Sequence, residues 1–240
     1  MKVQDIEIPL VSERGKLYRF FEILPGAITW TILISPFVLS LISPTIVVLL
    51  IIAYLLLWFV KSIGLNIRAL QGFKIMELHK NLDWGELQKE IEAGKTSDTD
   101  IQRPAWHFSN LERLKNQPSP YKPSELIQVA MIATWNESRE VLEPTIQSIL
   151  DSDYDMKKVI LVIAYEDRGG PEVEARAKQL IEDYRGKFMY ATACKHVDLP
   201  GEIIGKGGNI TYAGRELEKY LDKEKIDPMR VIVTTLDADN

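Results

Sequence analysis

Two acidic side chains near the end of the chain are the clearest candidates for chemistry. Residues 231–240, VIVTTLDADN, begin with β-branched residues that predict a buried strand, and Asp237 and Asp239 follow where this apolar run stops. In extended backbone, residues two apart point to the same face about 6 to 7 Å apart, so the two carboxylates could share one divalent ion. Such an ion would relieve their repulsion and could also hold a diphosphate. A lone D-x-D can equally be a solvated strand end, so its meaning depends on the residues upstream.

The elements that would position these acids begin at residue 126, where strand and helix patterns start to alternate. This alternation predicts an α/β fold with a mostly parallel sheet and flanking helices. Pro171 is expected to open a helix, because proline is best tolerated at the first helical position, and Pro144 is expected to kink or restart one. The predicted strands span residues 127–134, 159–164, 188–193 and 229–236, and the predicted helices span 138–150, the segment opening at Pro171, and 209–221.

Polar residues follow the predicted strands and enter the last predicted helix. Ligands of such sheets bind beyond the carboxyl ends of the strands, so we expect these residues to meet at one edge. Free backbone amides and a lysine at the glycine-rich entry 205–209 favour an anion, while the aspartates favour a cation. The sequence therefore predicts a site for a metal-bound nucleotide. Its candidate residues are Thr134, Asn136, Glu137, Glu166, Asp167, Lys206, Asn209, Asp237 and Asp239.

Three of these segments resemble the motifs of one enzyme family. IATWNE at 132–137 resembles P-x-Y-N-E, KGGNITYA at 206–213 resembles K-A-G-N-L-N-x-A, and LDADN at 236–240 carries D-x-D. In this order and spacing they resemble the family-2 glycosyltransferases, which are inverting, nucleotide-sugar-dependent enzymes of the GT-A fold. The membrane-embedded branch with the cellulose and hyaluronan synthases is the most similar in style. The sequence departs from the family pattern at Ala133, Trp135 and Thr211, and at Glu166-Asp167-Arg168, where D-D-G or D-D-S is usual.

The resemblance covers residues 126–240 and implies a GT-A, Rossmann-like sheet that binds a nucleotide-sugar donor, with a UDP-sugar as the first expectation. It also implies Mg²⁺ or Mn²⁺, which would neutralise the leaving diphosphate while an acceptor hydroxyl attacks the sugar from the opposite face. The implied donor-binding residues are Thr134, Asn136, Glu137, Glu166 and Asp167 around the nucleotide, Lys206 and Asn209 beside the diphosphate, and Asp237 and Asp239 at the ribose, the sugar and the metal.

The same resemblance leaves the catalytic base unassigned. In the family, an aspartate in a T-E-D-like segment and the Q-x-x-R-W motif of processive members both lie beyond the D-x-D, and this sequence stops at Asn240. We therefore expect a fragment of a longer enzyme, with an incomplete sheet and the base encoded beyond Asn240. Such a fragment is expected to bind the donor without turning it over.

Three other functions could account for the same residues. A P-loop nucleotidase is disfavoured because the glycine spacing before Lys206 is one residue short and no serine or threonine follows that lysine. A dinucleotide-binding oxidoreductase is disfavoured because the loop after the first predicted strand contains no glycine. A membrane-anchored binding module that keeps the fold as a non-catalytic scaffold stays open.

The N-terminal part predicts a membrane anchor. Residues 23–60 contain no charged side chain and divide at Ser43 and Pro44 into two halves, each near the length needed to cross a bilayer. Two spans joined by a tight turn are expected. A single span with a re-entrant first half, which Gly26 and Pro36 would favour, and a buried hairpin of a soluble protein were the alternatives. The connecting turn has no basic residue, whereas the outer ends are flanked by Arg14, Lys16, Arg19, Lys61, Arg68 and Lys74. This asymmetry predicts that both outer ends are cytoplasmic.

These observations divide the chain into four expected parts: a cytoplasmic segment 1–22, two transmembrane helices within 23–62, juxtamembrane helices and a linker within 63–125, and half of a glycosyltransferase domain over 126–240. Within residues 64–93, Gly72 and the segment 83–85 interrupt a helical pattern, so two helices are expected. They would lie on the membrane, with Phe73 and Trp84 at the headgroups, or pack on the soluble domain. Residues 94–104 are polar and lack periodicity, which indicates a linker.

Composition excludes several classes of site. The net charge is −5 and no basic run is present, which argues against nucleic acid as a partner. Cys194 is the only cysteine, so an internal disulfide or a cysteine-based zinc site is excluded. The histidines, His79, His107 and His196, lie far apart in the sequence. We expect each to be a surface or half-buried residue rather than a metal ligand.

Overall fold

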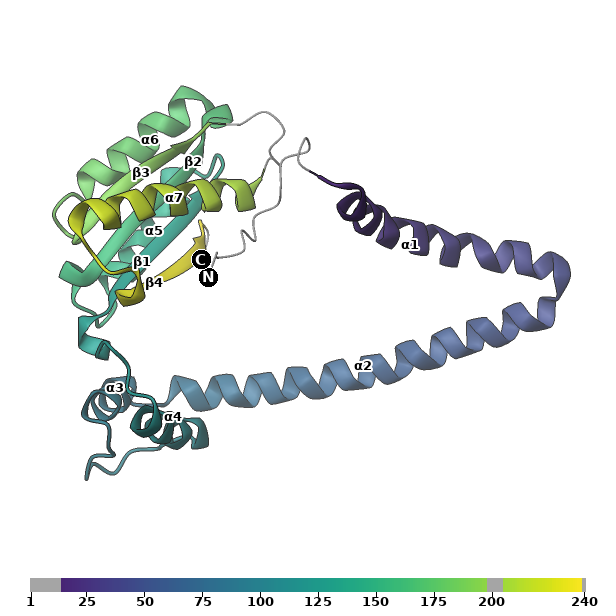
Figure 1. Ribbon diagram of the computed structural model, residues 1–240, viewed down its shortest axis with the longest axis horizontal. Coiled ribbons are helices and arrows are strands. Elements are labelled where there is room, and N and C mark those ends of the chain that lie inside the picture. The colour runs from purple at the N-terminus through teal and green to yellow at the C-terminus, as the bar shows by residue number, and fades with distance from the viewer. Residues whose placement is uncertain (1–13, 198–204, 239–240) are drawn as a thin grey trace. The chain divides into compact units, whose positions relative to one another are not determined.

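The computed structural model describes residues 14–197 and 205–238, and the chain divides into two compact units (Figure 1). The first, Met1–Glu112, is called the helical unit below, and the second, Arg113–Asn240, the sheet unit. Each unit has its own elements and its own polar centre. The two are therefore described one after the other.

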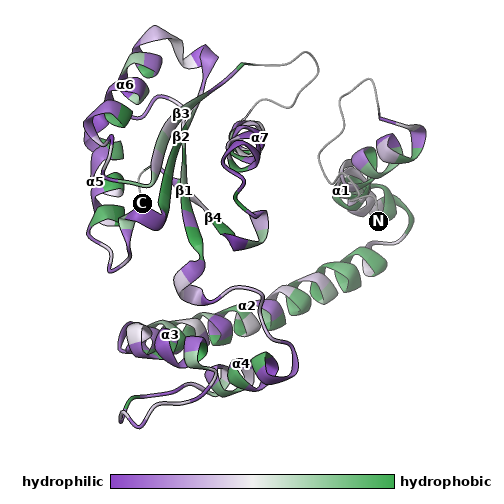
Figure 2. Cartoon of the chain, turned by 60° about the vertical axis from the view of Figure 1, so that its left-hand side comes forward, coloured by the Kyte–Doolittle hydropathy of each residue, from purple (hydrophilic) through white to green (hydrophobic). Residues whose placement is uncertain are grey.

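Two long helices begin the helical unit. α1 spans Lys16–Ile42 and α2 spans Pro44–Lys80. Ser43 alone separates them, as expected for two apolar segments joined by a tight turn. Both are long and apolar enough to cross a membrane by length and composition. No side chain of α1 is buried, and hydrophobic residues cover most of α2 (Figure 2). α2 continues through Gly72, so the predicted interruption there was wrong, because glycine weakens a helix by only about 1 kcal/mol.

Pro36 lies inside α1 without breaking it. Proline has no backbone N–H, so the carbonyl of Ile32, four residues earlier, loses its helical donor. The hydroxyl of Ser35 donates to this carbonyl at 3.3 Å. A local side chain thus supplies a partner for the carbonyl that the proline leaves without a helical donor.

Two shorter helices follow α2, and the second extends past the end of the helical unit at Glu112. α3 spans Trp84–Ala93 and α4 spans Ala105–Asn116, and the latter had not been predicted. Asp83 caps α3 by accepting a hydrogen bond from the Glu86 N–H at 2.9 Å, which explains the break in the helical pattern at residues 83–85. Gly94 ends α3 in the left-handed conformation, with φ of 67°, where glycine pays no steric penalty.

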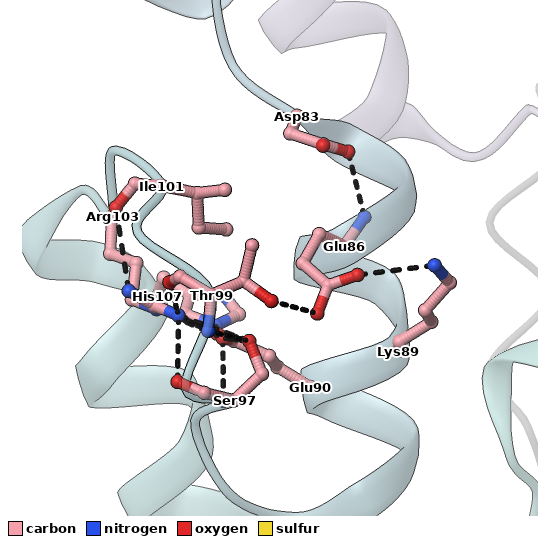
Figure 3. A network of polar contacts seen from close by, with 9 residues as sticks. All are labelled: Asp83, Glu86, Lys89, Glu90, Ser97, Thr99, Ile101, Arg103 and His107. Atoms are coloured by element: carbon pink, nitrogen blue, oxygen red, sulfur yellow. Dashed lines mark hydrogen bonds and ion pairs between the residues drawn. The ribbon is translucent and has the colours of Figure 1, made fainter.

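The segment predicted as a linker, residues 94–104, is bound to α3 through Glu90 (Figure 3). Glu90 is only 1 % exposed, and its Oε1 accepts hydrogen bonds from Arg103 Nη2 at 2.5 Å and from the Ser97 N–H at 2.8 Å. Arg103 Nη2 also donates to the carbonyls of Ser97 at 3.0 Å and Thr99 at 2.9 Å. The loop has no helix or strand, but it is an ordered part of this unit.

His107 completes this cluster of Glu90, Ser97, Arg103 and His107, which we call the Glu90 clasp. Its Nε2 lies 2.8 Å from Glu90 Oε2, which places the ring proton on Nε2 because a carboxylate only accepts. His107 is fully buried, and the prediction of a surface or half-buried residue was wrong for it. The hydrogen bonds from Arg103, which outweigh the effect of burial, hold the pKa of Glu90 well below its usual range.

The sheet unit contains four parallel strands in the order β3-β2-β1-β4. Their bounds are β1, Ile127–Thr134; β2, Val159–Glu166; β3, Tyr190–His196; and β4, Val231–Asp237. The predicted α/β class is therefore confirmed, and β1 has the predicted bounds. β2 begins at the predicted residue and ends two residues later than predicted, while β3 and β4 are shifted toward the C-terminus by one to three residues. Short 3-10 helices flank β1, β2 and β4 at Pro123–Glu125, Met156–Lys158, Asp167–Gly169 and Pro228–Arg230.

Helices cover both faces of the sheet (Figure 2). α5 (Arg139–Leu150) and α6 (Gly170–Asp183) lie on one face, and α7 (Lys206–Glu224) lies on the other. α5 contains Pro144 within one helix. The crossovers from β1 to β2 and from β2 to β3 run in one direction across the sheet, and the crossover from β3 to β4 runs in the other. Because such crossovers all have the same hand, α7 lies on the opposite face of the sheet from α5 and α6. The two cores include Ile132, Leu142, Leu161 and Leu180 on the first face, and Met131, Val162, Ala213 and Leu217 on the second.

β4 differs from the strand that the sequence predicted. Its side chains were expected to be buried, yet Ile232 is 45 % exposed and Val233 is 47 % exposed. The prediction was wrong because β4 pairs with β1 on one side and, within the described residues, with nothing on the other. Sequence composition indicates that a strand is apolar, but it does not indicate whether the strand lies in the middle or at the edge of the sheet.

Candidate functional site

The carboxyl ends of β1, β2 and β4 meet at one edge of the sheet. Thr134 is in register with Tyr165, and Ala133 is in register with Asp237. The strand order reverses at β1. The chain continues from β1 to β2 and β3 on one side of it, and then returns to place β4 on the other side. In open α/β sheets, ligands bind in the crevice outside the carboxyl ends at such a switch point. The topology therefore fixes where a site should lie before any side chain is considered.

A cavity of about 190 Å³ lies at this switch point. Six of the residues predicted from the sequence line it, and they come from three strand ends and from the start of α7. The structure adds Trp135 and Arg168, together with two alanines. The complete lining is Ala133, Thr134, Trp135, Glu137, Glu166, Arg168, Lys206, Asn209, Asp237 and Ala238.

Glu137 holds the turn that follows β1. Its Oε2 accepts hydrogen bonds from Thr134 Oγ1 at 2.6 Å, from the Trp135 N–H at 2.6 Å and from the Asn136 N–H at 3.1 Å. Burial raises the pKa of Glu137, but the hydrogen bond from Thr134 and those from backbone N–H groups outweigh it, so the pKa lies below its usual range. Glu137 is therefore ionised at neutral pH, and one of its oxygens is committed to the shape of the cavity wall.

Glu166, Arg168 and Trp135 form the next part of the wall. Glu166, at the end of β2, is 3 % exposed and accepts a hydrogen bond from Arg168 Nε. The guanidinium of Arg168 lies 3.9 Å from the centroid of the Trp135 ring, which is a cation–π contact. The Trp135 side chain is 42 % exposed. A planar cation and an indole at the rim offer a flat surface for a planar ligand.

Two predicted residues lie outside this cavity. Asn136 Oδ1 accepts a hydrogen bond from Arg176 Nη2 of α6 at 3.2 Å. Asp167 forms an ion pair with Lys195 at 2.8 Å, and Asp167 together with Glu174 holds the pKa of Lys195 above its usual range. Both side chains thus link neighbouring elements instead of facing the strand ends.

The entry of α7 contributes backbone amides, a lysine and a buried amide. Gly205 has φ of 143°, a conformation that residues with a Cβ rarely adopt. Because the first intrahelical bond runs from the Asn209 N–H to the Gly205 carbonyl at 3.2 Å, the preceding N–H groups of the helix have no intrahelical acceptor.

Asn209 is 2 % exposed and fixed by its Nδ2, which donates to the Ala164 carbonyl at 2.9 Å. Its Oδ1 is buried and has no hydrogen-bond partner within the described residues. A buried acceptor without a donor is costly, by about 1 to 3 kcal/mol. A hydroxyl or N–H group of a ligand would satisfy it, whereas a phosphate oxygen would not.

Asp237, at the end of β4, forms an ion pair with Lys206 Nζ. The next residue is anchored from α5, since Thr145 Oγ1 donates to the Ala238 carbonyl at 2.9 Å. Asp239, the second acid of the D-x-D, lies outside the described residues. No three His, Cys, Asp or Glu side chains are grouped as metal ligands in residues 14–197 and 205–238. One carboxylate beside an anion site fits the manner in which Mg²⁺ binds, through one or two carboxylates and substrate phosphates.

A larger cavity, of about 320 Å³, lies between β3 and α7. His196 is buried beside it and packs on Tyr212 with ring centroids 5.1 Å apart, so the prediction of a surface or half-buried histidine was wrong here too. Burial raises the pKa of the nearby Cys194 thiol to about 11, which makes it a poor nucleophile. The switch-point cavity is smaller, but it alone of these two gathers groups from three strand ends, and we take it as the candidate site.

Sequence reasoning missed Trp135 and Arg168 as members of the cavity. Both are adjacent to predicted candidates, and both replace the residue that the family pattern would place there. That departure was the available signal. Comparisons of the chain with protein-family models, with curated proteins and with solved structures found no match.

Proposed function

We propose that the switch-point cavity binds the nucleoside diphosphate of an activated sugar together with Mg²⁺ or Mn²⁺. The sheet unit would then be the donor-binding part of an inverting family-2 glycosyltransferase with a GT-A sheet. The observation that carries this proposal is the convergence of Asp237, Lys206 and the ends of β1 and β2 at the point where the strand order reverses. Motif order in the sequence supports the same function.

The proposal assigns a role to four of the residues that line the cavity. Asp237 would hold the divalent ion, which when bound stabilises the negative charge of a leaving diphosphate. Lys206 and the free N–H groups at the start of α7 would bind the phosphates, as helix N-termini with lysines do elsewhere. The orphaned Asn209 Oδ1 would accept from a ribose hydroxyl or a base N–H. Glu137 would keep the wall of the cavity in place through the turn after β1.

We also propose that α1 and α2 anchor the chain in a membrane with the sheet unit on the cytoplasmic side. The apolar length of both helices supports the anchor, and the basic residues at the outer ends support the orientation. Protease treatment of sealed, right-side-out and inverted vesicles tests it. Digestion of the sheet unit from the outside in right-side-out vesicles would disprove the orientation.

The proposed binding is tested by calorimetry on the full chain in detergent, with UDP titrated in the presence and absence of MnCl₂. We expect manganese-dependent binding of UDP, and a loss of about a hundredfold or more in affinity in Asp237→Asn, since a metal ligand is removed. Asp153→Asn is the matched control, because Asp153 is an exposed acid of the same unit that does not line the cavity. Its affinity should equal that of the wild type.

The outcomes separate the enzyme lineage from the scaffold. Manganese-dependent UDP binding that is sensitive to Asp237→Asn and Asp239→Asn supports the donor site. A folded wild-type chain that takes up neither UDP nor Mn²⁺ would overturn the proposal and favour a membrane-anchored scaffold without a nucleotide. Circular dichroism on each sample establishes that the fold is intact.

A further inference from the structure

We propose that Lys206 is the resident counter-ion of Asp237 and that it couples the entry of the metal to the entry of the nucleotide. In this scheme the divalent ion binds together with the diphosphate and not ahead of it. The inference rests on the proposed function and adds an order of binding to it. It follows from a contact within the cavity that the donor-site proposal does not explain.

The contact joins two elements that line the cavity. Lys206 is the first residue of α7 and Asp237 is the last residue of β4, and the lysine Nζ forms an ion pair with Asp237 Oδ1. Both line the cavity at the strand ends. The Lys206 side chain is 48 % exposed and the Asp237 side chain 60 %, so water screens the pair and the two groups can separate at little cost.

A metal that arrives alone meets an unfavourable site. Of the three carboxylates that line the cavity, Glu137 is bonded to the turn after β1 and Glu166 to Arg168. The third, Asp237, already has an ammonium group against it. A divalent ion would have to displace Lys206 from Asp237, and it would feel the repulsion of the lysine. At an exposed site such a repulsion lowers affinity measurably, although salt screens it.

A metal that arrives with a diphosphate meets a different site. The phosphates bring negative charge to the start of α7, where N–H groups lack intrahelical acceptors. A Cβ built on Gly207 would meet no atom of the described residues within 4 Å, which leaves room for a ligand beside the backbone there. Lys206 can then leave Asp237 for a phosphate, which frees the carboxylate for the ion. Each ligand therefore raises the affinity of the other by the same factor, as thermodynamic linkage requires.

The test measures Mn²⁺ binding by electron paramagnetic resonance and UDP binding by calorimetry, on the full chain in detergent. In the wild type, saturating UDP should raise the Mn²⁺ affinity by about tenfold or more. In Lys206→Met, Mn²⁺ alone should bind about tenfold more tightly than to the wild type, while UDP with Mn²⁺ should bind more weakly. The coupling factor should consequently fall. Lys206→Arg keeps the charge and should retain most of the coupling.

Lys219→Met is the matched control for overall charge. Lys219 lies on the same helix, is paired with Glu216 at 2.6 Å and does not line the cavity. It should leave both affinities and the coupling unchanged. Opposite changes for the metal and for the nucleotide in Lys206→Met cannot come from partial unfolding, which would weaken both.

Two results would overturn the inference. One is a wild-type chain that binds Mn²⁺ as tightly without UDP as with it. The other is a Lys206→Met variant whose Mn²⁺ affinity is unchanged or lower. If UDP binding still requires Mn²⁺ and is lost in Asp237→Asn, either result removes the counter-ion role of Lys206 and leaves the donor site standing. If the wild type binds no UDP and no Mn²⁺, both proposals fall together.

Discussion

Glu90 in the helical unit and Asp237 in the sheet unit are both carboxylates that contact a basic side chain, yet their surroundings are opposite. Glu90 is 1 % exposed and receives hydrogen bonds from Arg103, Ser97 and His107. The Asp237 side chain is 60 % exposed, and its ion pair with Lys206 lies in a cavity beside the buried, unsatisfied Asn209 Oδ1. The first cluster is closed and the second is open.

The difference shows how a structural carboxylate can be distinguished from a binding one. A buried charge is tolerable only when its partners are complete, and the loss of one partner then costs several kcal/mol. An exposed ion pair such as Lys206–Asp237 adds little stability, so its presence in the cavity where three strands end needs another explanation. We propose ligand binding as that explanation. The predictions below test this contrast, in order of decreasing effect.

Removal of the Glu90 carboxylate should open the clasp. In Glu90→Ala, Arg103 and His107 lose their buried partner, which we expect to lower the stability of the clasp by about 3 kcal/mol. The fraction of molecules in which residues 94–104 are detached from α3 should then rise about a hundredfold. Limited trypsin digestion after Lys95, within the loop, should accelerate by a similar factor, because cleavage follows the population of the open state. Unchanged digestion would show that the loop is held by other contacts.

Glu86→Gln is the control for this change. Glu86 lies on the same helix and contacts Lys89 at 3.1 Å and Thr99 at 3.3 Å. Its side chain is 17 % exposed, against 1 % for Glu90. Its loss should leave the digestion of the loop close to the wild-type rate. Equal effects of the two variants would mean that burial is not what gives Glu90 its importance.

Acid should weaken the clasp over a defined range. Because the pKa of Glu90 is lower in the folded chain than its ordinary value of 4.5, its contribution is fully present above about pH 4.5. The contribution is lost as the pH falls through the lower, folded-state pKa. Hydrogen exchange of residues 94–104, corrected for intrinsic rates, should therefore accelerate below pH 4.5 in the wild type. Glu90→Gln should lack this dependence, and a dependence that survives in the variant would assign it to another group.

A smaller effect is expected where a backbone contact positions the site. Thr145 is 2 % exposed, and Thr145→Val removes the hydrogen bond to the Ala238 carbonyl while keeping the shape of the side chain. An unsatisfied buried carbonyl should cost about 1 to 2 kcal/mol in the stability of the sheet unit, measured by thermal melting. The UDP affinity should fall several-fold, since Asp237 precedes the released residue. Thr145→Ser should retain both values.

The smallest effect on stability is expected at Asp237 itself. Asp237→Asn removes one charge from an exposed pair, which should change the free energy of unfolding by less than about 0.5 kcal/mol. The same variant should lose nucleotide binding, so a binding defect without a folding defect is the expected signature. A marked drop in melting temperature would place Asp237 with Glu90 among the structural carboxylates.

Much of the fold could be predicted from the sequence because the patterns are local. The absence of charge over residues 23–60 predicted two apolar helices, and the turn at Ser43 and Pro44 predicted where they divide. The alternation after residue 126 predicted the parallel α/β sheet, and β1 was located to the residue. The helix α4 and the ordered loop before it were missed, because Glu90 and Arg103 are thirteen residues apart and neither has a local signal.

The sequence by itself determined which residue types follow the strands, and therefore that acids, a lysine and an amide would gather at one edge of the sheet. Only the tertiary structure decided which of them share a cavity: Asn136 and Asp167 turn toward Arg176 and Lys195, while Trp135 and Arg168 join the wall. A residue that directly follows a strand lies at the carboxyl end of the sheet, because its place depends only on the order of residues along the chain. Its partner and its exposure depend on neighbouring elements, which packing alone brings together.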